Sequence, residues 1–388
     1  MRLDSEAFAA DPHGAYSALR KEYGPLAPVE LADGVAATLV LGYREALQIL
    51  GDPARFPTDP TDLSAKAGWP ALPLSQWRPS SARGEDHTRY RQAYIDCLAR
   101  VDLHALRTDV IANAVPLINS FCGEGAADLL NEYAVPLTVR VMNALVGFPP
   151  EADDAAFAAL THLRDAADAA AAEAAAEQLA AVVRTALADK RSRPGSDVMS
   201  ALLTHPSRFS DAEITRTVGM MYEGGAEPTW NLIANTLLEM TNDVSFRDVL
   251  LGGSLSTRDA IDDVLFGDPP MPNGCVGYPR QPQIIGATML PPNQPVITSM
   301  AASNNDPTIS GGDRTGNRSH LAWGAGPHTC PDKAQAVAMV IATEAVEQLL
   351  DVLPEIELAE QPQWRRGAFH RALTALPVTF PKTPPLNL

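Results

Sequence analysis

A long run of helix-favouring sequence limits the folds that this chain can adopt. From His87 to Asn242 the pattern is helical almost continuously. Within this run the alanine-rich segment Ala155–Lys190 favours helix at nearly every position, and Pro194-Gly195 then interrupts it. A further strong helix is expected from about Asp332 to Leu353. The chain should therefore be mainly helical.

Strand-forming segments lie on both sides of the helical run. Gly34–Leu50 is expected to form a short strand pair followed by a helix. Pro and Gly crowd Asp268–Pro307, where Gln283–Ile285 and Pro295–Ser299 are short β-prone pieces. The predicted fold class is mainly α with small β-sheets (α+β). We expect one domain over residues 1–388, with β-rich portions at roughly 25–60 and 270–300.

Composition and charge exclude several partners. Lys and Arg total 30 against 47 Asp and Glu, and the resulting net charge of -17 repels nucleic acid and anionic lipid. The N-terminal segment has no apolar core of a signal peptide, and no later apolar stretch is long enough to span a bilayer. We therefore expect a cytoplasmic protein with no membrane attachment.

Four dispersed cysteines without a CxxC pair indicate neither a zinc site nor a disulfide framework.

Cys330 ends a Gly/Pro loop and directly precedes the last strong helix. That helix carries apolar residues four apart, Val337, Ile341, Ala345 and Leu349, which is typical of a core-facing helix. The positive end of the helix dipole and free backbone N–H groups favour the thiolate, the form that ligates iron. Gly324 and Gly326 let the loop approach a flat ligand. The alternative for a lone cysteine is a small buried hydrophobe.

The loop and several other segments resemble the cytochrome P-450 (haem-thiolate monooxygenase) family, of the soluble bacterial type. Trp323, two glycines and His328 precede Cys330 at the spacing of that family's haem-binding loop. Three further segments resemble family segments in the same chain order: GEDHTRYRQ (Gly84–Gln92), NNDP (Asn304–Pro307) and ALPVTF (Ala375–Phe380). The resemblance covers essentially the whole chain. It implies a single haem-thiolate domain, with haem b (iron protoporphyrin IX) between a long kinked helix and the helix after Cys330.

Four basic residues are candidates for holding the haem propionates. His87 and Arg91 are four apart on a helix and project from one face, although spacing alone fits a solvated polar face as well. The resemblance implies that both contact a propionate. It adds His328 and Arg280, although Arg280 lies closer to Gly286 than the family pattern expects. It also places Trp323 in the haem pocket.

The longest predicted helix contains an interruption. Ser210 and Glu213 form a capping box, and the helix runs to about Met240. Gly224-Gly225 and Pro228 in its middle predict a distortion, because glycine and proline disfavour helix interiors. The alternatives are a functional distortion and a kink with no catalytic role.

The resemblance implies a catalytic role for this distortion. In the family an acid followed by a threonine delivers protons there, in a groove over the haem. Glu227 matches the acid, whereas Pro228 stands in the place of the threonine. Thr229 follows one position later, about 100° further round the helix. Glu227 and Thr229 are the catalytic candidates.

Other positions also depart from the family pattern. Asp263 and Phe266 stand where the family has Glu-x-x-Arg, and we expect Phe266 to pack as an apolar substitute while Asp263 keeps a reduced pair with Arg314. Asp332 replaces a glycine two residues after the cysteine. Its charge should give a lower reduction potential than that of an Asp332→Gly variant, which a spectroelectrochemical titration would measure.

Three functions are open on the sequence. The first is a monooxygenase that oxidises a small to medium apolar substrate with O₂ and electrons from a ferredoxin-type donor. Trp69 and Trp77, in a long loop at Pro57–Ser81, would then either line the substrate pocket or serve as ordinary packing residues. The second is peroxide-driven oxidation by the same haem. The third is a degenerate haem-binding protein without turnover.

Overall fold

The computed structural model describes residues 1–58, 84–164, 169–242, 256–309, 311 and 316–386. Trp69, Trp77 and nearly all of the predicted loop at Pro57–Ser81 lie outside these residues, as does Arg314. The helices are α1 (Glu6–Ala10), α2 (Pro12–Tyr23), α3 (Tyr43–Leu50), α5 (Gly84–Ala99), α6 (Leu103–Phe121), α7 (Val135–Val146), α8 (Asp153–Arg164), α9 (Ala169–Ser192), α10 (Val198–Leu203), α11 (Asp211–Met221), α12 (Glu227–Asn242), α14 (Thr257–Gly267), α15 (Met300–Asn304) and α16 (Asp332–Val352). The short helical turns are η2 (Leu129–Ala134), η3 (Pro150–Ala152), η4 (Tyr222–Ala226) and η5 (Gly326–His328). The strands are β1 (Leu26–Ala32), β2 (Val35–Val40), β3 (Ala126–Asp128), β4 (Cys275–Gly277), β5 (Gln283–Ile285), β6 (Thr288–Leu290), β7 (Val296–Thr298), β8 (Glu357–Leu358) and β9 (Pro377–Thr379).

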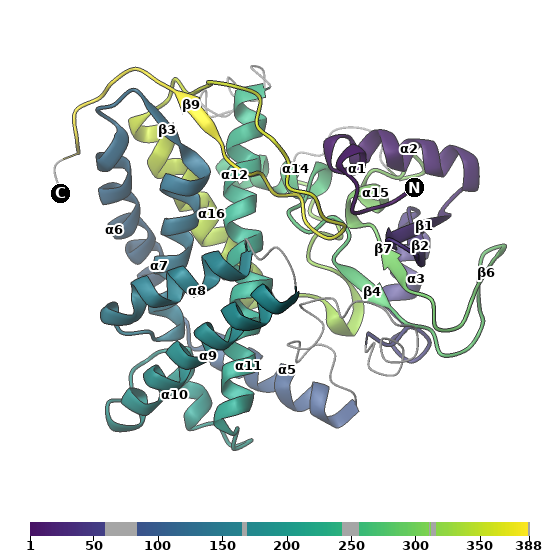
Figure 1. Cartoon of the computed structure of the whole chain (residues 1–388), viewed down its shortest axis with the longest axis horizontal. Coiled ribbons are helices and arrows are strands. Elements are labelled where there is room, and N and C mark those ends of the chain that lie inside the picture. The colour runs from purple at the N-terminus through teal and green to yellow at the C-terminus, as the bar shows by residue number, and fades with distance from the viewer. Residues whose placement is uncertain (59–83, 165–168, 243–255, 310, 312–315, 387–388) are drawn as a thin grey trace.

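Helices dominate one side of the molecule, and a small sheet with the N-terminal helices forms the other (Figure 1). The main sheet has the order β1-β2-β7-β4, in which β2 and β7 are parallel and the other pairs are antiparallel. The fold class predicted from the sequence is confirmed. One boundary was wrong, because Gly34–Leu50 supplies only one strand of the β1–β2 pair. Gly34 itself lies in the turn between them, with a φ of 72°.

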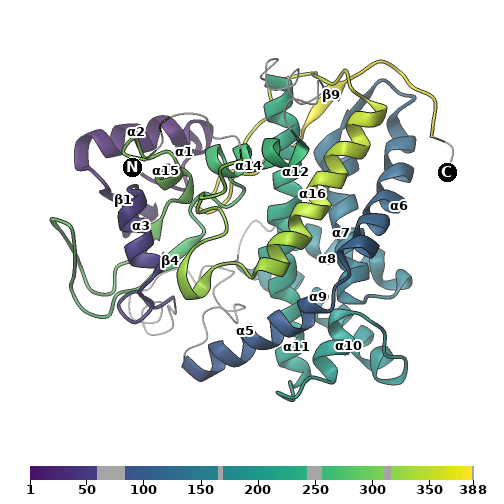
Figure 2. The same ribbon diagram turned by 180° about the vertical axis from the view of Figure 1, so that it is seen from behind.

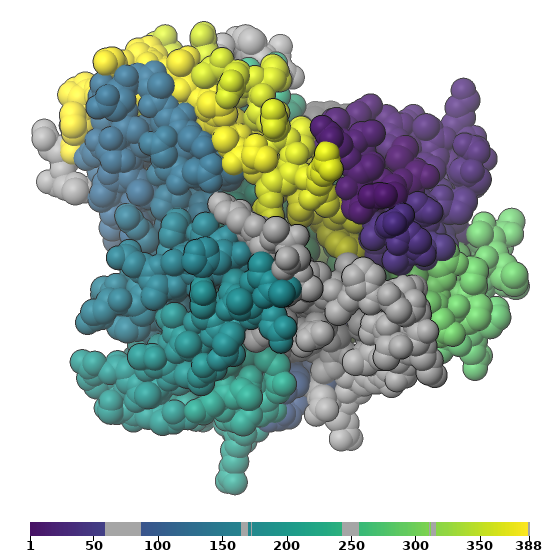
Figure 3. All heavy atoms as spheres, in the orientation of Figure 1, coloured from purple at the N-terminus to yellow at the C-terminus, as the bar shows by residue number. Residues whose placement is uncertain are grey.

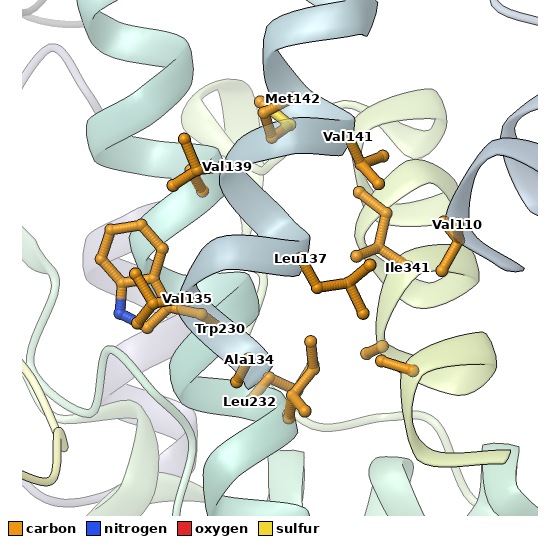
Figure 4. Close-up of a cluster of buried hydrophobic side chains, with 14 of the residues drawn as sticks. Val110, Ala134, Val135, Leu137, Val139, Val141, Met142, Trp230, Leu232 and Ile341 are labelled. Carbon is orange, nitrogen blue, oxygen red and sulfur yellow. The ribbon is translucent and has the colours of Figure 1, made fainter. Parts of the chain in front are cut away.

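Helix α16 lies between α6 and α12 and forms the centre of the helical side (Figure 2). The predicted stripe at Val337, Ile341, Ala345 and Leu349 is buried, with each residue at most 5% exposed. Residues of α6, α7 and α12 complete this core, including Val110, Leu137, Trp230 and Leu232 (Figure 4). Burial of this many large side chains fixes the position of α16, and therefore of the loop that precedes it.

The predicted distortion of the long helix is a π-helical turn. The capping box at Ser210 and Glu213 opens α11, and the chain continues through η4 into α12. Pro228 has no N–H to donate to Gly224, so the regular helical ladder cannot continue through this point. The helix is interrupted by the π-helical turn η4, which directly precedes Glu227 and Pro228. Such turns occur frequently at functional sites.

Glu213 of the capping box gives the stability of the fold a pH dependence. Its carboxylate accepts hydrogen bonds from Arg89 at 2.7 Å and from the Tyr90 hydroxyl at 2.9 Å. Arg89 first, and then Ser210 and Tyr90, lower the pKa of Glu213 to about 2 in spite of its burial. The lowered pKa means that Glu213 stabilises the fold above the pKa of an unfolded glutamate, and that this stabilisation is lost as the pH falls toward about 2.

We expect Glu213→Gln to lower the free energy of unfolding by about 2 kcal/mol at neutral pH, because hydrogen bonds to a charged group are lost. The difference from the unchanged protein should shrink as the pH falls from about 4.5 to about 2. Urea unfolding at several pH values measures it. Glu177→Gln is the matched control, because the Glu177–Arg184 pair is exposed and should contribute little at any pH. A difference at Glu213 that stays constant with pH would contradict the assignment.

The C-terminal segment runs back across the molecule to the N-terminal helices (Figure 3). Arg371 is buried in this segment, donates to the Ala9 carbonyl at 2.6 Å and pairs with Asp268 at 2.7 Å. Arg366 also forms an ion pair with Glu6. These contacts hold the stretch that contains Phe369 and His370 at a fixed place. Among the described helices, none combines the length and the apolar character that a bilayer span needs.

Candidate active site

The loop before α16 holds Cys330 through backbone contacts. The Cys330 N–H donates to the Trp323 carbonyl at 2.8 Å, and the Gln335 side chain donates to the Cys330 carbonyl at 2.7 Å. Trp323 is half-buried and packs on the helical core. The hydrogen bond from Cys330 to Trp323 closes the loop between these two residues. The loop places the Cys330 side chain just before α16 begins.

Both glycines of the loop have left-handed backbones, with φ values of 72° at Gly324 and 70° at Gly326. A Cβ on Gly326 would lie 2.2 Å from the Leu50 carbonyl oxygen. A Cβ on Gly324 would have ordinary contacts, of which the nearest is with Cys275 Sγ at 3.6 Å. We had expected both glycines to allow close approach to a ligand. At Gly326 the close neighbour is instead the end of α3.

We expect Gly326→Ala to cost more stability than Gly324→Ala. Both variants carry the strain of a left-handed non-glycine residue, about 1–2 kcal/mol, but only Gly326→Ala also places a Cβ 2.2 Å from a backbone oxygen, whereas the Cβ contacts at Gly324 are 3.6 Å or longer. Thermal unfolding of the two variants and of the unchanged protein measures the difference. Equal losses would show that the contact with Leu50 does not restrain the loop.

Cys330 borders two adjoining cavities of about 280 and 210 Å³. Seven residues line both: Tyr94, Gly224, Pro228, Pro270, Met271, His328 and Cys330. One wall comes from η4 and α12, and the facing wall comes from the loop of Cys330. The long distorted helix and the cysteine therefore enclose a common space, as expected from the sequence.

Three basic side chains gather at one side of the larger cavity. His87 and His328 have ring centroids 4.3 Å apart, and Arg91 donates to the Thr329 carbonyl at 2.9 Å. Burial, His87 and Arg91 lower the pKa of His328 to about 4, and burial and Arg91 lower that of His87. His328 Nδ1 is buried and has no hydrogen-bond partner among the described residues. The positive charges of these neighbouring bases repel one another. An anionic group bound among them would relieve that repulsion, so the cluster suits carboxylates.

This donor set fits a haem. A cysteine sulfur, a largely apolar space on either side and a cluster of bases match the iron, the flat macrocycle and the carboxylates of the group. Arg280 does not belong to this cluster. It is half-buried between β4 and β5 and is not among the described residues that line the two cavities, so its contact with a propionate stays a prediction.

The protein alone does not favour a thiolate at Cys330. Burial raises the pKa of the Cys330 thiol to about 12, against the lowering influence of Arg91, and Asp332 raises it further. We had expected the helix start to favour the thiolate, and burial outweighs that effect. Asp332 is the exposed first residue of α16, and its negative charge disfavours the thiolate, as expected from the sequence. Its effect on the reduction potential stays a prediction.

The two catalytic candidates face different cavities. Glu227 lines the larger cavity and forms an ion pair with Arg365 at 2.9 Å. Thr229 lines the smaller cavity, is 3% exposed and donates its hydroxyl to the Gly225 carbonyl at 2.7 Å. The Thr229 hydroxyl therefore does not replace the hydroxyl that is missing at Pro228, because it lies in a different cavity from Glu227.

The buried acid of α14 is Asp262, not Asp263. Asp263 is exposed, so it cannot be the acid of a buried ion pair. Asp262 pairs with Arg318 at 2.8 Å and with Arg258 at 3.3 Å. It also faces the buried His320 at 3.8 Å. Phe266 is buried as expected, and its ring meets the His320 ring edge-on at 5.1 Å.

Sequence reasoning missed several residues that line the larger cavity. Asn231 lies on α12, and Phe369 and His370 come from the C-terminal segment, which also supplies Arg365 to Glu227. The positions 223, 227 and 231 share the four-residue spacing of one helix face, and that pattern could have identified Asn231. No local pattern marks Arg365 or His370, because only the path of the C-terminal segment brings them to α12.

Bacterial P450 enzymes are similar to this chain over nearly its full length. Cytochrome P450 107B1 of Saccharopolyspora erythraea is 26% identical, with 96% of each chain covered. Cytochrome P450 monooxygenase PikC of Streptomyces venezuelae is 29% identical over 96% of this chain and 92% of its own. Among solved structures, the ligand-free P450 monooxygenase TamI superposes with a TM-score of 0.83 and 26% identity, over 98% of this chain and 93% of its own. The chain belongs to the cytochrome P450 family.

No family model matches the chain. The P450 fold is nevertheless clear, because epothilone B-bound cytochrome P450epoK also superposes with a TM-score of 0.86, over 99% of this chain and 100% of its own, at 23% identity. As a cytochrome P450 the protein is an oxidoreductase, a monooxygenase with haem as its cofactor. Relatives named for their reactions include a vitamin D(3) 25-hydroxylase of Pseudonocardia autotrophica, 27% identical over 97% of this chain and 96% of its own.

Proposed function

We propose that Cys330 ligates the haem iron, and that His87, Arg91 and His328 hold the propionates. The observation that carries this proposal is that Cys330 borders both cavities, with the three bases gathered at one side of the larger one. Haem iron would displace the proton that burial otherwise keeps on the sulfur, because a metal-coordinated thiol is deprotonated. Trp323, which lines the smaller cavity, would pack beside the haem.

We further propose that the enzyme hydroxylates a small to medium apolar substrate, using O₂ and electrons from a ferredoxin-type donor. Haem supplies the oxygen activation when it is bound. The chain's own residues enclose and orient the substrate, and the apolar lining at Met220, Met271 and Phe369 supports an apolar skeleton. Glu227 would hold a proton at this cavity, and Arg365 keeps the Glu227 carboxylate in position.

The absorption spectrum of the reduced, CO-bound protein tests the ligand assignment. Thiolate ligation gives a strongly red-shifted Soret band, and its absence in freshly purified haem-containing protein would overturn the role of Cys330. Turnover of 2-adamantanone with ferredoxin and its reductase, compared with turnover by peroxide alone, then tests the electron source.

Peroxide-driven oxidation is the second candidate, because of one observation. Pro228 carries no hydroxyl, and the Thr229 hydroxyl is bonded to Gly225 in the other cavity. Peroxide supplies the oxygen atom together with both electrons. Turnover with peroxide should therefore depend less on the proton-delivering hydroxyl that this chain lacks. Faster turnover with peroxide than with ferredoxin would favour this candidate. No turnover with either would favour a haem-binding protein without monooxygenase activity.

A further inference from the structure

The larger cavity has a polar strip on one otherwise apolar wall. Glu223, Glu227 and Asn231 are spaced four apart, lie along one face of the η4–α12 helix, and all line the cavity. Asn231 is only 2% exposed, and its Nδ2 has no hydrogen-bond partner among the described residues. A buried amide donor that is left unpaired is costly to the fold. Its position on the cavity wall therefore indicates a ligand atom as its partner.

A second buried polar atom lines the same cavity from the C-terminal segment. His370 Nδ1 has no hydrogen-bond partner among the described residues. The ring lies against Gly367 in a space that only glycine leaves open, because a Cβ there would lie 2.3 Å from His370 Nε2. Burial, and then Arg365, lower the pKa of His370, which favours the neutral imidazole. A neutral imidazole offers one donor and one acceptor nitrogen, so it can bind a hydroxyl or a carbonyl.

The chemistry of these atoms defines the ligand group. An amide nitrogen only donates, so the partner of Asn231 must be a hydrogen-bond acceptor, such as a carbonyl or hydroxyl oxygen, and an ammonium group cannot serve. Beside Asn231 a carboxylate is disfavoured, because Glu223 and Glu227 share its helix face, in contrast to the part of the cavity at His87, Arg91 and His328. The remaining lining is largely apolar, with Met220, Pro228 and Phe369 among it.

We propose that this cavity recognises the neutral oxygen of an otherwise apolar substrate, a ketone, lactone or hydroxyl, through the Asn231 amide, with the His370 imidazole as a second polar contact. This inference rests on the proposed function, because it takes the larger cavity to hold the haem propionates at His87, Arg91 and His328 and the substrate at the helix face of Asn231. It goes further in naming a substrate class and the residues that select it. A fixed polar contact would also set which carbon of the substrate faces the reacting centre.

Isothermal titration calorimetry of the haem-containing protein with an isosteric pair of probes tests the proposal. The probes are 2-adamantanone and 2-methyleneadamantane, which differ in whether the exocyclic atom accepts a hydrogen bond. Asn231→Leu removes the donor while keeping a similar volume, and we expect it to weaken 2-adamantanone binding by about 3- to 10-fold. Binding of 2-methyleneadamantane should be unchanged or stronger. His370→Leu should act in the same direction with a smaller effect.

Met220→Leu is the matched control, since it alters the same cavity without removing a hydrogen-bonding group of this strip. It should change the affinity of both probes alike. Equal effects of Asn231→Leu on the two probes, or no binding of either probe to the unchanged protein, would overturn the proposal. A red-shifted Soret band in the same sample separates these results from failure of the proposed function, which would show as a missing band.

Discussion

Replacing Cys330 with alanine is expected to abolish the red-shifted Soret band of the reduced, CO-bound protein and to remove monooxygenase activity. Cys330 borders both cavities, and its sulfur is the proposed ligand of the haem iron. Loss of a group that merely supports a metal ligand typically costs about 10- to 100-fold in affinity or activity, and loss of the ligand itself should exceed that range. Absorption spectra and turnover measure both effects.

Cys275→Ala is the matched control. Cys275 lines the smaller cavity and lies 3.9 Å from the Met300 sulfur, but it sits on β4 rather than at the start of α16. Its replacement should leave the Soret band in place. If the Cys330 variant retained the red-shifted band, or if the Cys275 variant lost it, the assignment of the ligand would be wrong.

Replacing Asn304 with alanine should produce the largest loss of stability among the changes outside the cavities. Asn304 is 1% exposed and donates to the carbonyls of Leu265 at 3.1 Å and Phe266 at 3.3 Å. Its oxygen accepts from the Leu321 N–H at 2.7 Å. One side chain thus joins the end of α14 to the beginning of the Cys330 loop. Leaving these buried groups without partners should lower the free energy of unfolding by about 2–5 kcal/mol.

Asn305→Ala provides the comparison for Asn304. Asn305 also donates to the Phe266 carbonyl, at 3.2 Å, but it is only partly buried, so water can replace its contacts. Urea unfolding should show the smaller loss for Asn305. We also expect the Asn304 variant to retain less haem, because Leu321 begins the segment that leads to Cys330. Similar losses for both variants would mean that Asn304 does not restrain the loop.

Features that depend on neighbouring residues were predictable from the sequence. The capping box at Ser210 and Glu213, strand β5 and the extent of α16 follow from local spacing and propensity, and the structure has each of them. The combination of Trp323, His328 and Cys330 was equally local, because one loop contains all three. These features fixed the fold class and the centre of the site.

Features that depend on long-range contacts were not predictable. Arg365 pairs with Glu227, 138 residues away in the sequence. Arg280 is a propionate candidate by resemblance, and the structure places it between β4 and β5, outside the described lining of the two cavities. The buried acid was placed one residue late, at Asp263. The helix period could have corrected that choice, since Asp262 lies four residues after Arg258 and next to the buried Ile261.

The main sheet has a consequence for synthesis of the protein on the ribosome. Strand β2 pairs in parallel with β7, whose residues come about 260 positions later in the chain. At ordinary rates of translation, β1 and β2 would wait about 10–50 s for that partner. During this time the buried residues Leu39 and Val40 would be open to other chains. Strands β1 and β2 therefore leave the ribosome long before the main sheet can complete its pairing.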